Sequence, residues 1–189
     1  QGIDITVAET WLIYACIFSI ILLFAVRKLQ FIALTATLTV ILVGIQYQQV
    51  FAHSQQKMLA VYHTNPMSNL CLINGGQAVL LADSALVDDA NKIQFHIMHH
   101  FWAKNIEQIF SSDWANSEIL PISTQPIGRN QLIAWEGKTI LAHNQALENL
   151  TISVDYLVIQ QNSANHWDNI AGIKTKTIIF DYSNSLYTI

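Results

Sequence analysis

The sequence TWLIYACIFSIILLFAVRKLQFIALTATLTVILVGIQYQ, residues 10–48, decides the fold class of this chain. It contains two uncharged apolar stretches, residues 10–26 and 29–48, separated only by Arg27 and Lys28. At a helical rise of about 1.5 Å per residue, each stretch is near the lower limit for crossing a hydrocarbon core about 30 Å thick. We therefore predict a transmembrane helical hairpin in residues 1–52 and a soluble domain in residues 53–189.

A signal peptide or a buried hairpin of a soluble protein would fit the residues around the apolar stretches less well. A signal peptide needs positive residues before its apolar segment, whereas residues 1–10 contain only the acids Asp4 and Glu9. The hairpin of a soluble protein rarely has a helix that is apolar all round, as residues 13–24 are. Membrane spans are therefore the favoured interpretation.

The residues around the spans predict their orientation and surroundings. Arg27 and Lys28 form the only basic pair near the membrane, and positive side chains stay cytoplasmic, so we expect both chain ends outside. The chain begins with Gln rather than Met, almost at the membrane, and we expect a fragment with further spans upstream. Small or polar residues of the second span could pack against those helices: Thr35, Thr37, Thr39 and Gly44.

The soluble domain contains two segments with a similar layout, SNLCLINGGQAVLLAD and RNQLIAWEGKTILAHN. Each has two apolar runs around a short turn, Asn74-Gly75-Gly76 in one and Glu136-Gly137 in the other, which predicts two β-hairpins. The predicted strands are residues 57–63, 69–73, 78–82, 131–135, 138–143, 154–159 and 177–180.

The remaining segments complete a layered fold. Residues 154–159 and 177–180 are continuous β-branched runs, typical of strands buried on both faces. Residues 95–110 are predicted to be partly helical, and residues 166–171 a short helix capped by Ser163 or Asn165. Hairpins and buried strands joined by helices predict a layered α/β (α+β) sandwich.

Charge and cysteine content limit the function classes. Residues 57–189 carry seven basic and eleven acidic side chains, whereas a domain that binds phosphate backbones by itself normally has a basic face. Without interleaved basic residues, core packing and the membrane interface are the expected roles of the domain's aromatic side chains, rather than stacking on bases. Cys16 and Cys71 lie in different parts of the chain, and we expect two free thiols.

The order of these elements after a membrane hairpin resembles the C-terminal region of ComEC-type competence proteins. That family shows the patterns "ailI..g..iLiDtG", "DvLkv.HHGS" and "aiiS.G..N". The counterparts here are residues 69–73 with 77–84, then 137–143, then VDYLVIQQNS (154–163) and IIFDYSN (178–184). Family members are polytopic inner-membrane proteins regarded as the channel for single-stranded DNA, and their last domain resembles a metallo-β-lactamase fold.

Departures from the family pattern bear on catalysis. The metal-binding stretch His-x-His-x-Asp-His of that fold is absent, and Gln160-Gln161-Asn162-Ser163 stands where the family can show His-His-Gly-Ser. Amides are poor zinc ligands compared with imidazole, carboxylate or thiolate groups. The resemblance therefore implies a degenerate, metal-free domain that is not an enzyme, with no catalytic, cofactor-binding or metal-binding residues.

Several residue groups could still carry chemistry, and we expect a structural role for each. His96, His99 and His100 would share a helix face but lack the acidic partner of a zincin motif. Asp83 is expected to accept backbone hydrogen bonds at a strand end, and Asp181, with Ser183 and Asn184, to form a turn. The sequence His166-Trp167-Asp168 has no nucleophile motif to accompany it.

The residues and the resemblance together lead to three hypotheses. The first is the C-terminal part of a bacterial inner-membrane channel for single-stranded DNA, whose extracytoplasmic domain is a scaffold or entry platform. Its partners would be the bilayer, the upstream helices, the DNA strand and other competence proteins. The second is a metal-dependent hydrolase, for example a nuclease, which requires some of His96, His99, His100, His143 and Asp83 to converge. The third is an unrelated membrane-tethered binding module.

Overall fold

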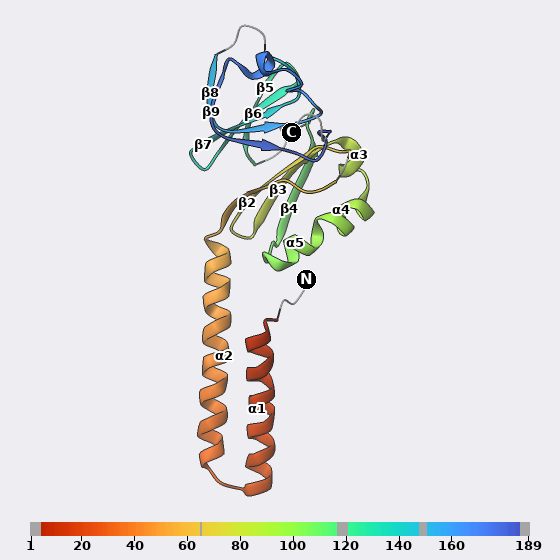
Figure 1. The fold of residues 1–189 in the computed structure, drawn as a ribbon. Helices are drawn as coiled ribbons and strands as arrows, with labels where there is room; N and C mark the ends of the chain where they lie inside the picture. The colour runs from red at the N-terminus through yellow and green to blue at the C-terminus, as the bar shows by residue number, and fades with distance from the viewer. Residues whose placement is uncertain (1–4, 65, 117–120, 148–150, 186–189) are drawn as a thin grey trace.

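The computed structural model describes residues 5–64, 66–116, 121–147 and 151–185 as a mixed α+β structure. Two long helices come first, and two β-sheets with short helices between their strands follow (Figure 1). The elements are α1 (Val7–Val26), α2 (Gln30–Ser54), β1 (Lys57–Ala60), β2 (Asn69–Asn74), β3 (Gln77–Ala82), α3 (Ser84–Val87), α4 (Ala90–His96), α5 (Met98–Ala103), β4 (Gln108–Asp113), β5 (Ser123–Ile127), β6 (Asn130–Trp135), β7 (Lys138–His143), β8 (Ile152–Ile159), the 3₁₀ helix η2 (Trp167–Ile170) and β9 (Ile173–Phe180).

Both helices of the hairpin are longer than the apolar stretches that predicted them. Helix α1 begins at Val7 because Thr6 and Glu9 form a capping box, in which each side chain accepts the backbone N–H of the other residue. Helix α2 continues beyond residue 48 to Ser54. The Ser19 and Thr35 hydroxyls lie 2.8 Å apart and link the two helices by a hydrogen bond.

The surface of the hairpin suits lipid rather than water. Both helices are long and apolar enough to cross a membrane. Trp11, Phe24 and Leu29 are at least 70% exposed, and so are not packed inside a soluble core. An exposed apolar surface of this extent is typical of a membrane interaction.

The part of the chain that follows the hairpin, called the domain below, contains two sheets built on a similar plan. The first sheet has the order β1-β2-β3-β4, with β1, β2 and β3 antiparallel and β4 parallel to β3. The second has the order β5-β6-β7-β8-β9, antiparallel from β5 to β7 and parallel from β7 to β9. The two predicted hairpins of similar layout are β2–β3 and β6–β7, and each is followed in its sheet by a parallel strand.

The layers of the domain are held by three apolar clusters. The two sheets pack on each other through side chains such as Leu72 and Val158. Helices α3–α5 cover the other face of the first sheet, where Ile97 and Phe101 are fully buried. The 3₁₀ helix η2 covers the other face of the second sheet through Ile170. The layered α+β sandwich is therefore confirmed.

Several local predictions were wrong. Strand β1 ends at Ala60 rather than at residue 63, and strands β4 and β5 had not been predicted. Residues 95–110 are partly helical, as predicted, but the helical part ends at Ala103 and the unpredicted strand β4 follows it. Residues 177–180 are not buried on both faces, because β9 is an edge strand on which Ile178 is 40% exposed. The cap of η2 is His166, which makes no side-chain capping bond, and not Ser163 or Asn165.

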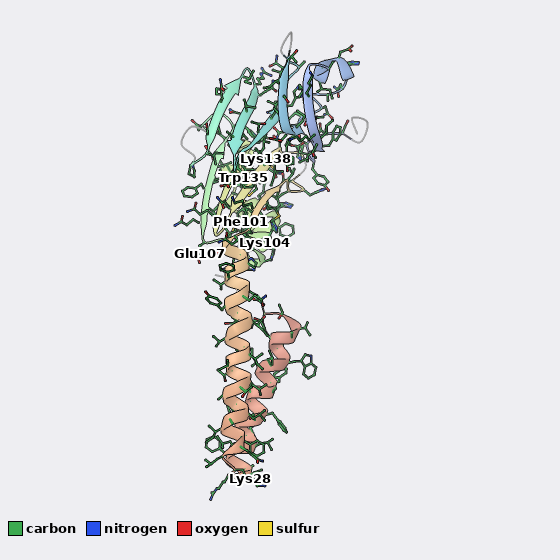
Figure 2. The ribbon with its side chains drawn as sticks, turned by 90° about the vertical axis from the view of Figure 1, so that its left-hand side faces the viewer. Lys28, Phe101, Lys104, Glu107, Trp135 and Lys138 are labelled. Atoms are coloured by element: carbon green, nitrogen blue, oxygen red, sulfur yellow. The ribbon has the colours of Figure 1, made fainter. Side chains whose placement is uncertain are left out.

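The end of α2 is fixed to the domain by Gln56, Gly75 and Lys104, which we call the joint. The Gln56 Nε2 atom donates to the carbonyls of Gly75 (2.8 Å) and Lys104 (2.7 Å), and Gly75 N donates to Gln56 O (2.8 Å). Figure 2 shows Lys104 beside the upper end of α2. An ion pair between Lys57 and Glu136 connects the same region to the second sheet. The joint places the end of α2, the β2–β3 turn and the end of α5 at one level.

Candidate functional site

The carboxyl ends of several strands bring polar side chains together between the sheets. Asp83 follows β3, Gln160 and Gln161 follow β8, and Asp181 follows β9. The parallel ladder continues one residue past the strands, because Gln160 N donates to His143 O (2.9 Å) and Asp181 N to the last carbonyl of β8 (3.1 Å). We call Asp83, Gln160, Gln161 and Asp181 the carboxyl-end cluster.

Asp83 is held by its own sheet. Its carboxylate accepts hydrogen bonds from Ser68 N (2.8 Å) and Ser68 Oγ (2.9 Å), and Asp83 N donates to Ser68 O (3.1 Å). Gln161 Nε2 of the second sheet lies 3.5 Å from the same carboxylate. The prediction that Asp83 accepts a backbone hydrogen bond at a strand end is confirmed, and both of its oxygens have partners.

Asp181 is almost completely buried, at 1% exposure. Its Oδ1 atom accepts from Ser183 N (3.0 Å), Ser183 Oγ and Asn184 Nδ2 (3.0 Å), which forms the predicted turn. No described residue bonds to its Oδ2 atom. Burial raises the pKa of Asp181 to about 6; the bonds from Ser183 oppose this shift, and the nearby charge of Asp83 adds to it.

The residues after β8 are amides in a loop that interlocks with the loop after β9. Gln160 is fully buried, and neither atom of its side-chain amide has a hydrogen-bond partner among the described residues. Gln161 and Asn162 have positive φ angles of 51° and 58°, and the backbone N–H groups of both donate to side chains of the β9 loop, Ser183 Oγ (2.7 Å) and Asn184 Oδ1 (2.9 Å). Asn tolerates this left-handed conformation, and it stands where the family pattern has Gly.

His143 lies on the other face of the second sheet. In parallel strands, residues in register point to the same face, and His143 is in register with Ile159 and through it with Phe180, both of the cluster packed on η2. Its Nδ1 atom is 2.7 Å from Ser163 Oγ, which itself donates to His143 O (2.6 Å), so Nδ1 carries the proton. Burial lowers the pKa of His143, and a hydrogen bond with the backbone of Asn169 opposes this shift.

The three histidines of the α4–α5 segment do not converge. The helix is interrupted at Ile97, whose φ and ψ of −120° and −41° are not helical. His96 contacts the ring of Phe95, His99 that of Trp102, and His100 Nδ1 lies 2.7 Å from the hydroxyl group of Tyr62. Burial lowers the pKa of His100. These contacts agree with the packing role expected for the three rings.

The residues present do not fit the metal centre of a complete metallo-β-lactamase fold. Across the described part of the chain, no group of three or more His, Cys, Asp or Glu side chains lies close enough to hold a metal ion. At the carboxyl-end cluster, Gln160 and Gln161 are amides, and both carboxylate oxygens of Asp83 accept hydrogen bonds from Ser68. His143 points to the other face, which leaves Asp181 Oδ2 as the cluster's carboxylate oxygen without a partner.

The remaining candidates from the sequence also lie apart. His166 and Asp168 are exposed at the start of η2, and the side chain of Trp167 lies outside the described part. Three aromatic side chains that could have stacked on bases pack against the core between the sheets instead: Trp114, Trp135 and Tyr156. Tyr182 is half-exposed, with its ring centroid 4.1 Å from that of His63.

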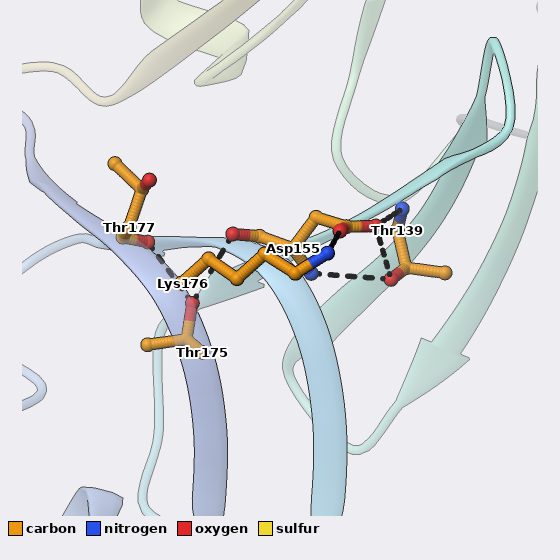
Figure 3. A network of polar contacts seen from close by, with 5 residues as sticks. All are labelled: Thr139, Asp155, Thr175, Lys176 and Thr177. Atoms are coloured by element: carbon orange, nitrogen blue, oxygen red, sulfur yellow. Dashed lines mark hydrogen bonds and ion pairs between the residues drawn. The ribbon is translucent and has the colours of Figure 1, made fainter.

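A second polar network ties the amino ends of β7, β8 and β9 together (Figure 3). Asp155 accepts hydrogen bonds from Thr139 N (3.0 Å) and Lys176 Nζ (2.6 Å). The Lys176 bond, followed by the Thr139 bond, lowers the pKa of Asp155 to about 2. The network borders a shallow hollow of about 240 Å³, and Lys176 is largely exposed. Because the carboxylate is already paired within the ladder, we assign it a structural role.

Sequence reasoning missed the partners that make the cluster structural. Ser68 precedes β2, and only the pairing of Asn69 with Ala82 brings it beside Asp83. The interlocking of the two loops through Ser183 and Asn184 depends on the parallel pairing of β8 with β9. In the sequence, the signal for each contact is a polar residue at the edge of an apolar run, and such a signal is too weak to predict the partner.

Comparisons with known proteins give one match. The model of the ComEC C-terminal domain family matches residues 59–189. No curated protein and no solved structure matches the chain. The matched range begins within β1 and covers both sheets and the carboxyl-end cluster.

Proposed function

Because the chain belongs to the ComEC family of membrane proteins, which points to DNA uptake during competence, we propose that it is the C-terminal part of a channel for single-stranded DNA. In this proposal α1 and α2 are the last two spans of a multi-pass protein in the bacterial inner membrane. The domain acts as a scaffold or entry platform, and it has no catalytic residues. Its fold is a degenerate metallo-β-lactamase fold, a proposal supported by the order of layers: helices, two sheets and η2.

The observation that carries the scaffold role is the chemistry of the carboxyl-end cluster. A hydrolytic site would need convergent ligands or a positioned base with a free acceptor. The cluster instead contains a carboxylate paired with Ser68, two amides and a buried acid in a turn. The hydrogen bonds of these residues hold one loop on another, as a structural platform requires.

The surface of the hairpin supports a place in a larger bundle. Thr37 and Thr39 are exposed and bond only to carbonyls of their own helix, at 2.8 and 2.9 Å. Gly44 is open, with no atom within 4 Å of the position that a Cβ would take. Small residues allow helices in lipid to approach closely. The face of α2 that carries Thr37 and Gly44, seven residues apart, would receive upstream helices of the same protein.

The placement of the domain follows from the loop between the helices. Arg27 and Lys28 lie in that loop, which the positive-inside rule puts in the cytoplasm and the domain outside. The domain is net acidic, so DNA would be bound by the whole channel and not by this domain alone. The joint holds the domain in place relative to α2. Other competence proteins could dock on the domain.

Metal content and cleavage activity test the proposal. The purified full chain in detergent is dialysed against zinc and manganese, its bound metal is measured, and it is incubated with labelled single-stranded DNA. We expect far less than one metal ion per chain and no metal-dependent cleavage. A stoichiometric metal ion that is lost in Asp83→Asn or Asp181→Asn, together with cleavage of the strand, would contradict the scaffold role.

A further inference from the structure

Helices α4 and α5 carry an aromatic and apolar surface that no described part of the chain covers. Phe95 is 76% exposed. Beside it are two hollows of about 300 and 430 Å³, which share Gln94 and Trp102 in their walls. Ile93 and Met98 add apolar side chains to the first hollow. We call this surface the α4–α5 face.

The joint holds the α4–α5 face close to where α2 leaves the membrane. Gln56, two residues past the end of α2, donates to the carbonyl of Lys104 at the end of α5. Figure 1 shows α5 at the end of the domain nearest the helical hairpin. The connection between α2 and the domain is short, because only two residues separate Ser54, the last residue of α2, from the first residue of β1.

The membrane-contacting surface of α2 extends almost to the joint. Tyr47, Val50 and Phe51 are each more than half exposed on the last turns of α2, and they share one side of the helix by their spacing. Aromatic residues at the end of a span favour the headgroup layer. From Phe51 to Gln56 the rise is only about 8 Å, so the headgroup layer reaches towards the level of α5.

We propose that the α4–α5 face rests on the phospholipid headgroup layer of the same membrane, with Phe95 and Trp102 inserted among the lipids. Helices that lie along a bilayer are stabilised there by the apolar area that their aromatic rings bury among the lipids. The face would fix the tilt of the domain on the membrane as a second contact beside the joint. This inference rests on the part of the proposed function that places α1 and α2 in the bilayer.

Quenching of tryptophan fluorescence by brominated lipids tests the contact. The full chain is placed in phosphatidylcholine–phosphatidylglycerol vesicles whose lipids carry bromine near the top of the acyl chains. Single Trp→Phe variants then assign the quenched fluorescence to Trp102, to Trp11 at the end of α1, and to Trp135 in the core between the sheets. We expect Trp102→Phe and Trp11→Phe each to remove a quenched component, and Trp135→Phe to remove none.

The outcomes separate this inference from the proposed function. Quenching that falls in Trp11→Phe but not in Trp102→Phe would overturn the headgroup contact and leave the membrane hairpin intact. If neither variant changed the quenching, both proposals would fail. Phe95→Asp should lower the Trp102 component by about half or more, with the domain still folded by circular dichroism. Ile178→Asp, at an exposed apolar residue of β9, is the matched control and should leave it unchanged.

Discussion

At the scale of single residues, two members of the carboxyl-end cluster, Asp181 and Gln160, have unusual environments for polar side chains. Asp181 is an acid that is only 1% exposed, and burial raises its pKa to about 6. Gln160 is an amide buried without a partner among the described residues, which ordinarily costs about 1–3 kcal/mol. Both lie on the face of the second sheet that meets Asp83. Their variants therefore report on the cluster without altering the rest of the core.

Asp181→Asn should make the stability of the domain less dependent on pH. The pKa of Asp181 is higher in the folded state than its ordinary value of 3.8, so its contribution is fully present below that value and is lost as pH rises through about 6. The loss is on the order of 2 kcal/mol. Urea unfolding of the full chain in detergent, from pH 4.5 to 7.5, should show this fall in the native protein and not in Asp181→Asn. Parallel pH profiles would contradict it.

Gln160→Met should leave the domain as stable as the native protein, or more stable by about 1 kcal/mol. The change keeps the length of the side chain and removes two buried polar atoms that lack partners in the described structure. The measurement is the urea midpoint at pH 7. Asn184→Ala is the opposing control, because it removes bonds to Ile159 O (2.6 Å) and Asp181 and should cost about 1–2 kcal/mol. A loss of stability in Gln160→Met would mean that the amide has a partner.

At the scale of elements, the sequence predicted those strands that carry apolar side chains. The runs that became β2, β3, β6 and β7 flank turns with Gly. Strands β4 and β5, each at an edge of its sheet, gave no such signal, since residues 108–111 are exposed and β5 contains Pro126. Edge strands are commonly polar or carry proline. The cluster was predicted only in part, since the turn roles of Asp83 and Asp181 are local and their meeting with Gln160 depends on strand pairing.

The two hairpin turns differ in the room they leave for a side chain. Glu136 and Gly137 both have positive φ, whereas in the β2–β3 turn only Gly75 does. A Cβ on Gly75 would lie 3.0 Å from the carbonyl oxygen of Ser54, and one on Gly137 would meet nothing within 4 Å.

Gly75→Ala should therefore destabilise the domain more than Gly137→Ala. Both replacements carry the cost of a left-handed conformation, about 1 kcal/mol, and the first also pushes against the end of α2. Thermal unfolding of the two variants in the same detergent gives the comparison. Equal losses of stability in the two variants would contradict this prediction, because they would show that the contact of residue 75 with the end of α2 has no energetic cost.

At the scale of the whole molecule, the hydrogen bonds of the joint connect a membrane hairpin to a layered domain. The proposed arrangement places the domain outside the cytoplasmic membrane. Ser84→Cys, at the exposed first residue of α3, should react with an impermeant maleimide in intact spheroplasts, and Leu29→Cys in the loop between the helices only after lysis. Native Cys71 is buried and Cys16 lies within α1, so the unmodified chain is the background control. The reverse pattern of labelling would contradict this topology and would place the domain in the cytoplasm.

Transformation frequency with variants of the carboxyl-end cluster tests the central claim, a role in DNA uptake without catalysis, most directly. The gene is replaced by Asp83→Asn or Gln160→Met in the source bacterium, and protein levels are matched by immunoblot. Loss of a catalytic acid or base lowers a rate by about 10²-fold or more. The scaffold account predicts frequencies close to wild type for both variants, and a clear fall for Gly75→Ala at the joint. A loss of about 10²-fold in Asp83→Asn, with the protein folded and present, would contradict it.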